Sequence, residues 1–235
     1  MQLRLLQHRP RTGRHEHRVV QPLRPLRHTS LFAPEPIGLL LGDHDGLNRL
    51  AGLFSFAAYS RHTVVHVPLR DAVPPDEGRG ERVDLVLAHH SYGLRPSVWP
   101  RLRRTPGPGT PLTLRTDEAR TGRDGAAWRE HAARPGCRDE LRHALHARTL
   151  FLFGSRDVFA EAAMSCAFAA GWGPRQKGVA QGRLALVSSL PGLAQRPGGG
   201  HPYEVLICYK PYPPYTHFTP PGRSARRRRP TAASP

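Results

Sequence analysis

The sequence predicts an α/β protein with a mostly parallel, Rossmann-like three-layer sheet, partial or irregular in places, and with disordered basic termini. Three observations predict this fold class. Short continuous apolar runs such as 149–153 are typical of strands buried on both faces. A helical spacing of apolar residues follows that run directly, over 158–170. Strand and helix patterns then alternate along the chain, as in a sheet covered by helices.

The predicted organisation has three parts. Residues 1–30 are rich in arginine and histidine, contain Glu16 as their only acid and are interrupted by prolines, so we expect a disordered basic arm. Residues 31–218 hold the apolar runs and are predicted to form a single α/β domain. Within it, 94–126 is rich in Arg, Pro, Gly and Thr and is expected to be a long loop. Residues 219–235 form a Pro/Arg-rich tail.

Several elements are expected before the long loop. Apolar runs predict strands at 37–41, 63–67 and 83–88, and helical spacing predicts a helix over 47–58. Asp43 or Asp45 is placed to cap this helix.

The second half of the domain contains the clearest α/β pattern. A partly helical segment is expected within 127–147, with its apolar face between Asp139 and His146. The helix over 158–170 has Ser155 or Asp157 as its cap. Further strands are expected at 149–153, 184–187 and 203–209, with at least one antiparallel member in the sheet.

The charge of the chain indicates a polyanionic partner. The formal net charge is +17, and only Lys177 and Lys210 among the 35 basic residues are lysines. The planar arginine fork suits phosphates and base edges, which predicts a nucleic-acid partner and salt-sensitive binding. GC-rich coding, or a spurious shifted frame that yields a poorly folded product, is an alternative source of this arginine excess.

Cysteine usage and hydropathy bear on the compartment. Cys137, Cys166 and Cys208 are scattered and form no CxxC pair, which excludes a zinc ribbon and fits a reducing nuclear or cytoplasmic compartment. The Arg-rich, acid-poor start leaves a mitochondrial transit peptide as a minor alternative. No apolar run reaches transmembrane length, so no membrane partner is predicted. The oligomeric state is not predicted.

One strand end and one cluster of charges are the candidate binding features among the motifs. No GxGxxG or GxxxxGK[ST] loop is present. His89 and His90 follow a predicted strand, where open α/β sheets bind ligands, but adjacent strand residues point to opposite faces and would not share a metal. Ser91 lies outside any GxSxG elbow. The tail run Arg226, Arg227, Arg228 and Arg229 is read as a nucleic-acid contact or nuclear-localisation signal, with a solvated tail as the alternative.

The last predicted strand resembles one family. The run HPYEVLI at 201–207 resembles the PYE-containing strand of the DPPW-motif adenine-N6 methyltransferases, in the methyltransferase-like-four branch, and the likeness extends over about 60–210. This resemblance implies methylation of nucleic acid with S-adenosylmethionine as cofactor.

The same resemblance implies a set of site residues. It places a catalytic strand end at Asp84, His89, His90 and Tyr92, with Arg103 and Arg104 as phosphate contacts. The chain has His-His-Ser-Tyr at 89–92 where the family has Asp-Pro-Pro-Trp, and only Tyr92 retains an aromatic ring. A weak or inactive methyltransferase-like domain is therefore expected, with a non-enzymatic Arg-rich nucleic-acid-binding protein as the alternative.

Overall fold

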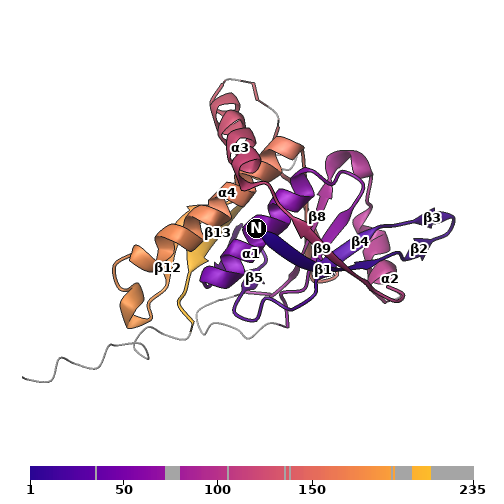
Figure 1. Cartoon of the computed structure of the whole chain (residues 1–235), viewed down its shortest axis with the longest axis horizontal. Helices are drawn as coiled ribbons and strands as arrows, with labels where there is room; N and C mark the ends of the chain where they lie inside the picture. Colours follow the sequence, from indigo (N-terminus) through magenta and orange to yellow (C-terminus); the bar gives the residue numbers. More distant parts are fainter. Residues whose placement is uncertain are drawn as a thin grey trace, which may run out of the picture.

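Two helices packed side by side, α1 (His44–Ala58) and α4 (Arg156–Trp172), connect two mixed sheets (Figure 1). A computed structural model describes residues 1–34, 36–71, 80–104, 106–134, 136–137, 139–191, 193 and 203–212. Each helix contacts strands of both sheets. The rings of Phe54 and Phe159 meet between the helices, with their centroids 6.2 Å apart. The core of the protein is therefore centred on this helix pair.

The larger sheet has seven strands. Their order is β10 (Arg142–His146), β11 (Thr149–Gly154), β8 (Asp84–His89), β7 (Val64–Val67), β4 (Val19–Pro22), β1 (Gln2–His8) and β9 (Thr110–Arg115). The smaller sheet has the order β12 (Ala185–Ser189), β13 (Glu204–Tyr209), β6 (Ile37–Gly42) and β5 (Ser30–Phe32). A short hairpin joins β2 (Arg11–Thr12) to β3 (His15–Glu16).

The prediction of a mostly parallel sheet is wrong. In the two sheets as described, only the neighbours β11–β8, β7–β4 and β13–β6 run parallel, and the other pairs are antiparallel. The physical reason is the connections: β10–β11 and β5–β6 are joined by links too short for a crossover helix, which forces antiparallel pairing. The α/β class itself is confirmed.

Residues 1–30 are not a disordered arm. They form β1, the short hairpin and β4, and β5 begins at Ser30. Leu3 and Leu5 are buried while Gln2 and Arg4 are exposed, which is the alternation of a strand with one buried face. The high content of arginine and histidine concealed this period-two pattern. The predicted boundary at residue 30 therefore divides one sheet.

The segment 94–126 is not a long loop either. It contains α2 (Trp99–Arg104), β9 and the first half of α3 (Glu118–Ala132). Asp117 caps α3, where its side chain accepts a hydrogen bond from the backbone N–H of Arg120 at 2.9 Å. Trp99 and Leu102 fix α2 because both side chains are buried.

The predicted helical face between Asp139 and His146 is instead strand β10. It pairs antiparallel with β11 through a tight turn at Ala147 and Arg148, whose φ angles of 49° and 56° are those of a hairpin turn. Neither residue is a glycine or asparagine, so the sequence carries no obvious signal for this turn. Hairpin pairing overrides the local helical spacing.

The remaining predicted elements are confirmed. The six strands expected from apolar runs are observed as β6, β7, β8, β11, β12 and β13, and the two expected helices are α1 and α4. Asp43 and Ser155 are the capping residues, each accepting a hydrogen bond from the backbone of the first turn. The predicted tail 219–235 lies outside the described residues.

The fold contains two copies of one β–β–α–β–β unit. The first copy is β5–β6–α1–β7–β8, and the second is β10–β11–α4–β12–β13. Ser30 faces Leu41 in the first hairpin, and their counterparts 112 positions later, Arg142 and Phe153, face each other in the second. The helix caps Asp43 and Ser155 have the same offset.

The two units exchange their last hairpins. Strand β8 of the first unit pairs parallel with β11 of the second, and β13 of the second pairs parallel with β6 of the first. The registers correspond, because Gly154 faces His89 just as Gly42 faces Tyr209. Each sheet thus depends on both units. Strands β4, β1 and β9 extend only the larger sheet, beyond β7.

Candidate functional site

The residues predicted from the resemblance do not form one site. Asp84 is the first residue of β8 and His89 is its last. At about 3.3 Å per residue, the two backbones are about 16 Å apart. His90 and Tyr92 follow His89 in a short 3-10 turn. Asp84 is therefore separated from the other three residues by the length of the strand.

Asp84 lies in a buried ion cluster. The residue is 1% exposed, and its Oδ1 accepts hydrogen bonds from the backbone N–H groups of Leu69 and Arg70, at 3.0 and 3.2 Å. Its Oδ2 lies 3.4 Å from both Arg70 Nε and Arg103 Nη1, and 3.7 Å from His66 Nε2. The predicted phosphate contact Arg103 is thus paired with a carboxylate.

The electrostatics of this cluster stabilise the ionised form of Asp84. Burial raises the pKa of Asp84, but the adjacent His66 ring and the backbone N–H and charge of Arg70 outweigh that effect and lower the pKa below its ordinary value. An ionised, fully partnered carboxylate of this kind holds β7, β8 and α2 together. Its oxygens are already occupied by these partners.

At the other end of β8, His89 serves as a local cap. Its Nδ1 accepts hydrogen bonds from the backbone N–H of Ser91 at 3.2 Å and from Ser91 Oγ at 2.7 Å. Its ring lies against that of His90, with centroids 4.2 Å apart. Burial, followed by the neighbouring His90, lowers the pKa of His89. His89 is therefore a neutral group that organises the turn.

Tyr92 borders a cavity of about 610 Å³ beside this turn. Its hydroxyl lies 3.1 Å from His17 Nδ1, and His17 Nε2 lies 2.7 Å from Thr12 Oγ1. Three histidines from two segments, His15 and His17 from one and His62 from the other, line the cavity with Tyr92. Within the described part of the chain, no group of three or more His, Cys, Asp or Glu side chains has the arrangement needed to hold a metal ion.

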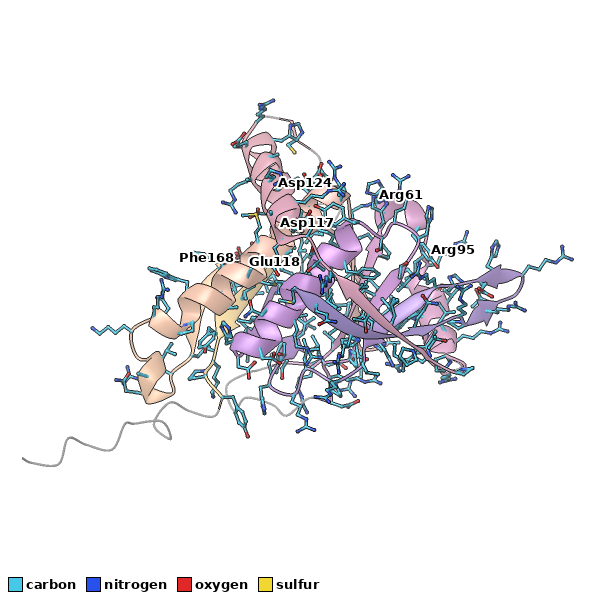
Figure 2. The ribbon with its side chains drawn as sticks, viewed as in Figure 1. Arg61, Arg95, Asp117, Glu118, Asp124 and Phe168 are labelled. Atoms are coloured by element: carbon cyan, nitrogen blue, oxygen red, sulfur yellow. The ribbon has the colours of Figure 1, made fainter. Side chains whose placement is uncertain are left out.

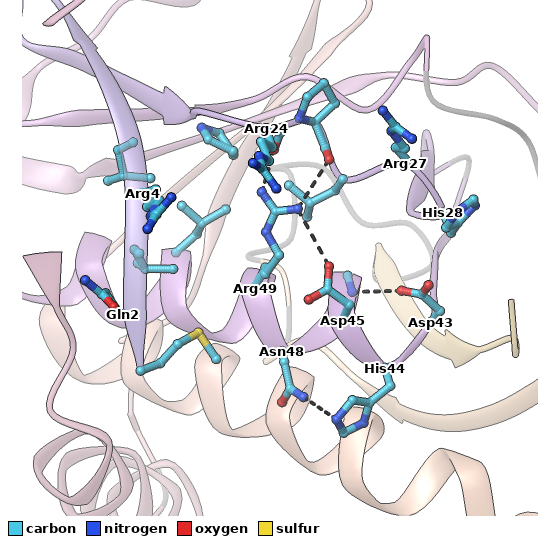
Figure 3. Close-up of a pocket in the computed structure, with 18 residues that line it drawn as sticks. Gln2, Arg4, Arg24, Arg27, His28, Asp43, His44, Asp45, Asn48 and Arg49 are labelled. Atoms are coloured by element: carbon cyan, nitrogen blue, oxygen red, sulfur yellow. Dashed lines mark hydrogen bonds and ion pairs between the residues drawn. The ribbon is translucent and has the colours of Figure 1, made fainter. Parts of the chain in front are cut away.

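A larger cavity, of about 1060 Å³, lies beside the first turns of α1 (Figure 3). Three segments line it: the start of β1, the connection between β4 and β5, and the first turns of α1. Arg4, Arg24, Arg27, His28 and Arg49 supply its basic groups.

The local structure explains why these arginines face the cavity. Arg4 lies between the buried residues Leu3 and Leu5 on β1, so its side chain points away from the core. The buried side chain of Leu26 anchors the connection that carries Arg24 and Arg27. The guanidinium of Arg49 donates to the carbonyl oxygens of Arg24 and Pro25, which fixes this connection against α1 (Figure 3).

Positive charge predominates in the cavity. Asp43 is occupied as the cap of α1, accepting from Gly46 N–H at 2.8 Å, and burial raises its pKa. Asp45 lies 3.7 Å from Arg49. Arg4, Arg24 and Arg27 make no side-chain hydrogen bond or ion pair with any residue in the described ranges. Three guanidinium groups are thus available to an anion.

Sequence reasoning missed this cavity because residues 1–30 were predicted to be disordered. The alternation around Leu3 and Leu5 was the available signal.

Arg104 is exposed at the end of α2 and is not part of the cavity. The predicted contacts Arg226, Arg227, Arg228 and Arg229 lie outside the described residues.

The chain matches no protein family model, no curated protein and no solved structure.

None of the helices in the described residues is both long and apolar enough to cross a bilayer. Cys137, Cys166 and Cys208 form no disulfide with one another, and burial raises the pKa of Cys166.

Proposed function

We propose that this protein binds nucleic acid, with backbone phosphates held in the arginine-lined cavity beside α1. The observation that carries the proposal is the set of three unpaired guanidinium groups, Arg4, Arg24 and Arg27, around one concave surface. Guanidinium forks match the geometry of phosphate oxygens and bind them in a bidentate manner. A concave surface of one charge sign also concentrates the electrostatic potential.

A polyanion fits the cavity better than a small anion. A cavity of about 1060 Å³ is larger than most small-molecule sites, which are about 300–1,000 Å³. The net charge of +17 favours association with extended phosphate chains over the whole surface. The buried ion cluster at Asp84 contributes to stability under this proposal and has no role in catalysis.

Fluorescence anisotropy with a labelled 20-nucleotide probe tests the proposal. The triple variant Arg4→Ala, Arg24→Ala and Arg27→Ala should bind more weakly at low salt. Each lost phosphate contact should reduce the slope of log K against log salt by about 0.7 for single strands or 0.9 for duplex, so the slope should fall by about 2–3 in total.

The matched control removes the same charge elsewhere. Arg14, Arg123 and Arg142 are exposed arginines outside the cavity, and the triple alanine variant at these positions has the same net charge. It should retain most of the affinity. Equal losses in the two triple variants would show that net charge alone drives binding, and the cavity would then have no special role.

The predicted terminal contacts need separate deletions. Removal of residues 223–235 tests whether the arginine run of the tail binds nucleic acid. Removal of residues 1–30 also removes β1 and β4, so it does not isolate a surface contact. A cooperative thermal transition of the purified chain would argue against the alternative of a poorly folded product of a spurious frame.

Methyltransferase activity is less well supported. The residues expected for it lie at opposite ends of β8, and Asp84 is already paired with Arg70 and Arg103. Calorimetric titration with S-adenosylmethionine tests this activity directly. If the titration produces no heat and the melting temperature does not change, the methyltransferase hypothesis is excluded, and the proposal of nucleic-acid binding is unaffected.

A further inference from the structure

An exposed aromatic pair lies on the last two turns of α4. Phe168 is 53% exposed and Trp172 is 46% exposed. Their ring centroids are 6.2 Å apart and their planes differ by 14°. Figure 2 shows Phe168 projecting from α4 away from the rest of the molecule. Two nearly parallel aromatic rings are thus exposed together on the outer face of one helix.

The helix geometry keeps this surface open. The two residues are four positions apart and therefore share one face of α4. Ala167 and Gly171, also exposed, add little bulk between and beside the rings, and the space next to Gly171 is empty. The opposite face of the helix is buried through Cys166, Ala169 and Ala170. The rings are therefore held on a rigid support.

The charge around the rings suits a phosphate-bearing partner. The guanidinium of Arg175 lies 5.7 Å from the centroid of the Trp172 ring. No acidic residue occurs in the sequence between Glu161 and Glu204, whereas Arg175, Lys177 and Arg183 do. Aromatic rings interleaved with cations on a groove or face are the means by which proteins bind single strands without sequence preference.

A hydrogen bond links this surface to the arginine-lined cavity. His44, which lines the cavity, has its Nδ1 3.0 Å from the carbonyl oxygen of Ala170, which lies between Phe168 and Trp172 in the chain. A strand that contacts both surfaces therefore passes over the last turn of α4.

From these observations we infer that Phe168 and Trp172 stack on unpaired bases, and that the preferred ligand is single-stranded nucleic acid. This inference rests on the proposed function, because the arginines hold the phosphates of the same strand. In a duplex the base faces are covered by their neighbours, whereas bases of a single strand are free to stack on side-chain rings. The aromatic pair therefore confers a preference for single strands over duplex.

Binding of a 15-nucleotide oligothymidylate and of a 15-base-pair duplex to the full chain tests the inference. The variant Phe168→Ala, Trp172→Ala should lose at least about fivefold in affinity for the single strand, since each stacked base contributes about 1–3 kcal/mol. Its affinity for the duplex should not change. The control Ile37→Ala, Leu186→Ala removes two other exposed apolar side chains, 54% and 58% exposed, and should leave both affinities unchanged.

Tryptophan emission gives an independent measurement. Oligothymidylate should quench the emission of the wild-type chain. Trp172→Phe keeps an aromatic ring, so it should retain the affinity while losing the quench. Equal loss of single-strand and duplex binding in the aromatic variant, or no loss, would overturn the inference.

The two proposals fail in different ways. If the wild-type chain binds neither probe, the proposed function and this inference both fall. If it binds both equally and the Phe168→Ala, Trp172→Ala variant does the same, only the inference falls. Sedimentation velocity tests whether a second copy of the chain binds the aromatic surface instead. If the wild type self-associates and this variant does not, the surface is a contact between two copies of the chain, and the inference falls.

Discussion

The imidazole Nδ1 of His44 lies 3.0 Å from the carbonyl oxygen of Ala170, so the first residue of α1 meets the last turn of α4. Asn48, one turn further along α1, is 2.9 Å from the other ring nitrogen of His44. These contacts join the cavity wall to the helix end that carries the aromatic pair. They make the two proposed surfaces parts of one rigid region.

Loss of this link should loosen α4 locally. His44→Ala is expected to lower the free energy of unfolding by about 1 kcal/mol, the typical net contribution of one hydrogen bond. Amide hydrogen exchange should accelerate in the last turn of α4 and stay unchanged in β8. His146→Ala, at an exposed strand position, is the control. Uniform acceleration across the protein would contradict a local role.

Asp84 should be the most sensitive charged position for stability. Asp84→Asn leaves Arg70 and Arg103 without their counter-charge and should cost about 2–4 kcal/mol at pH 7, measured by urea unfolding. The folded-state pKa of Asp84 is lowered, so its contribution is present above its ordinary value of 3.8 and is lost as the pH falls through the folded-state pKa. The difference in the free energy of unfolding between variant and wild type should shrink below about pH 3.8. A difference that does not change with pH would show that the charge of Asp84 is irrelevant.

Glu161 should show the opposite pH dependence. Its side chain is largely buried, and burial raises its pKa even though Arg129 pairs with it at 2.9 Å. An acid whose folded-state pKa is raised costs stability as the pH rises from its ordinary value, 4.5, through the folded-state pKa.

Arg129→Ala should therefore destabilise the protein by about 1 kcal/mol at pH 7, a modest value because the arginine is mostly exposed, and have little effect near pH 4. Urea unfolding at the two pH values measures the difference. An equal cost at both would show that Arg129 acts through packing alone.

The turn between β10 and β11 should tolerate, and benefit from, a residue suited to positive φ. Ala147 has a φ of 49°, which costs a non-glycine residue about 1 kcal/mol. Asparagine is favoured at this position of a two-residue hairpin turn. Ala147→Asn should raise the free energy of unfolding by about 0.5–1 kcal/mol. A lower melting temperature would show that the turn differs from the one described above.

The acidic side chain beside the cavity should weaken ligand binding. Asp45 lines the cavity and is exposed, and its only ion-pair partner in the described ranges is Arg49. At about 6–8 Å in water, removing one like charge relieves about 0.5–0.7 kcal/mol of repulsion. Asp45→Asn should therefore strengthen binding of the 20-nucleotide probe about two- to threefold at low salt and have less effect at high salt. Weaker binding would place the phosphates elsewhere.

The elements that could be predicted from sequence are those whose local pattern agrees with their tertiary role. The strand–helix pairs β6–α1 and β11–α4 show apolar runs that lead into capped helices, and both were predicted. Strands β1 and β4 were missed because they lie in a segment rich in arginine and histidine, although β1 alternates between buried and exposed residues and β4 is largely buried. Strand β10 was missed because its turn contains no residue typical of positive φ.

Other features depend on information that is not local. Whether neighbouring strands run parallel is determined by the exchange of hairpins between two units, and no short window of sequence reveals it. The cavity is assembled from three segments: pairing of β1 with β4 brings Arg4 near Arg24, and the hydrogen bonds of Arg49 hold the first turns of α1 against this connection. Asp84 was predicted as a catalytic residue, and the structure places it in a buried ion cluster with Arg70 and Arg103, partners that the sequence alone did not indicate.

The exchanged hairpins have a consequence for any attempt to study the halves separately. A fragment ending after α3 would carry β7 and β8 without β11, and a fragment beginning at β10 would carry β12 and β13 without β6. Neither fragment could complete a sheet by itself, whereas the two mixed together would restore both. Alternatively, two copies of one fragment could pair with each other, because the registers of the two units correspond. The order of the strands therefore predicts that the two fragments complement each other. It also predicts that the intact chain unfolds in one cooperative event.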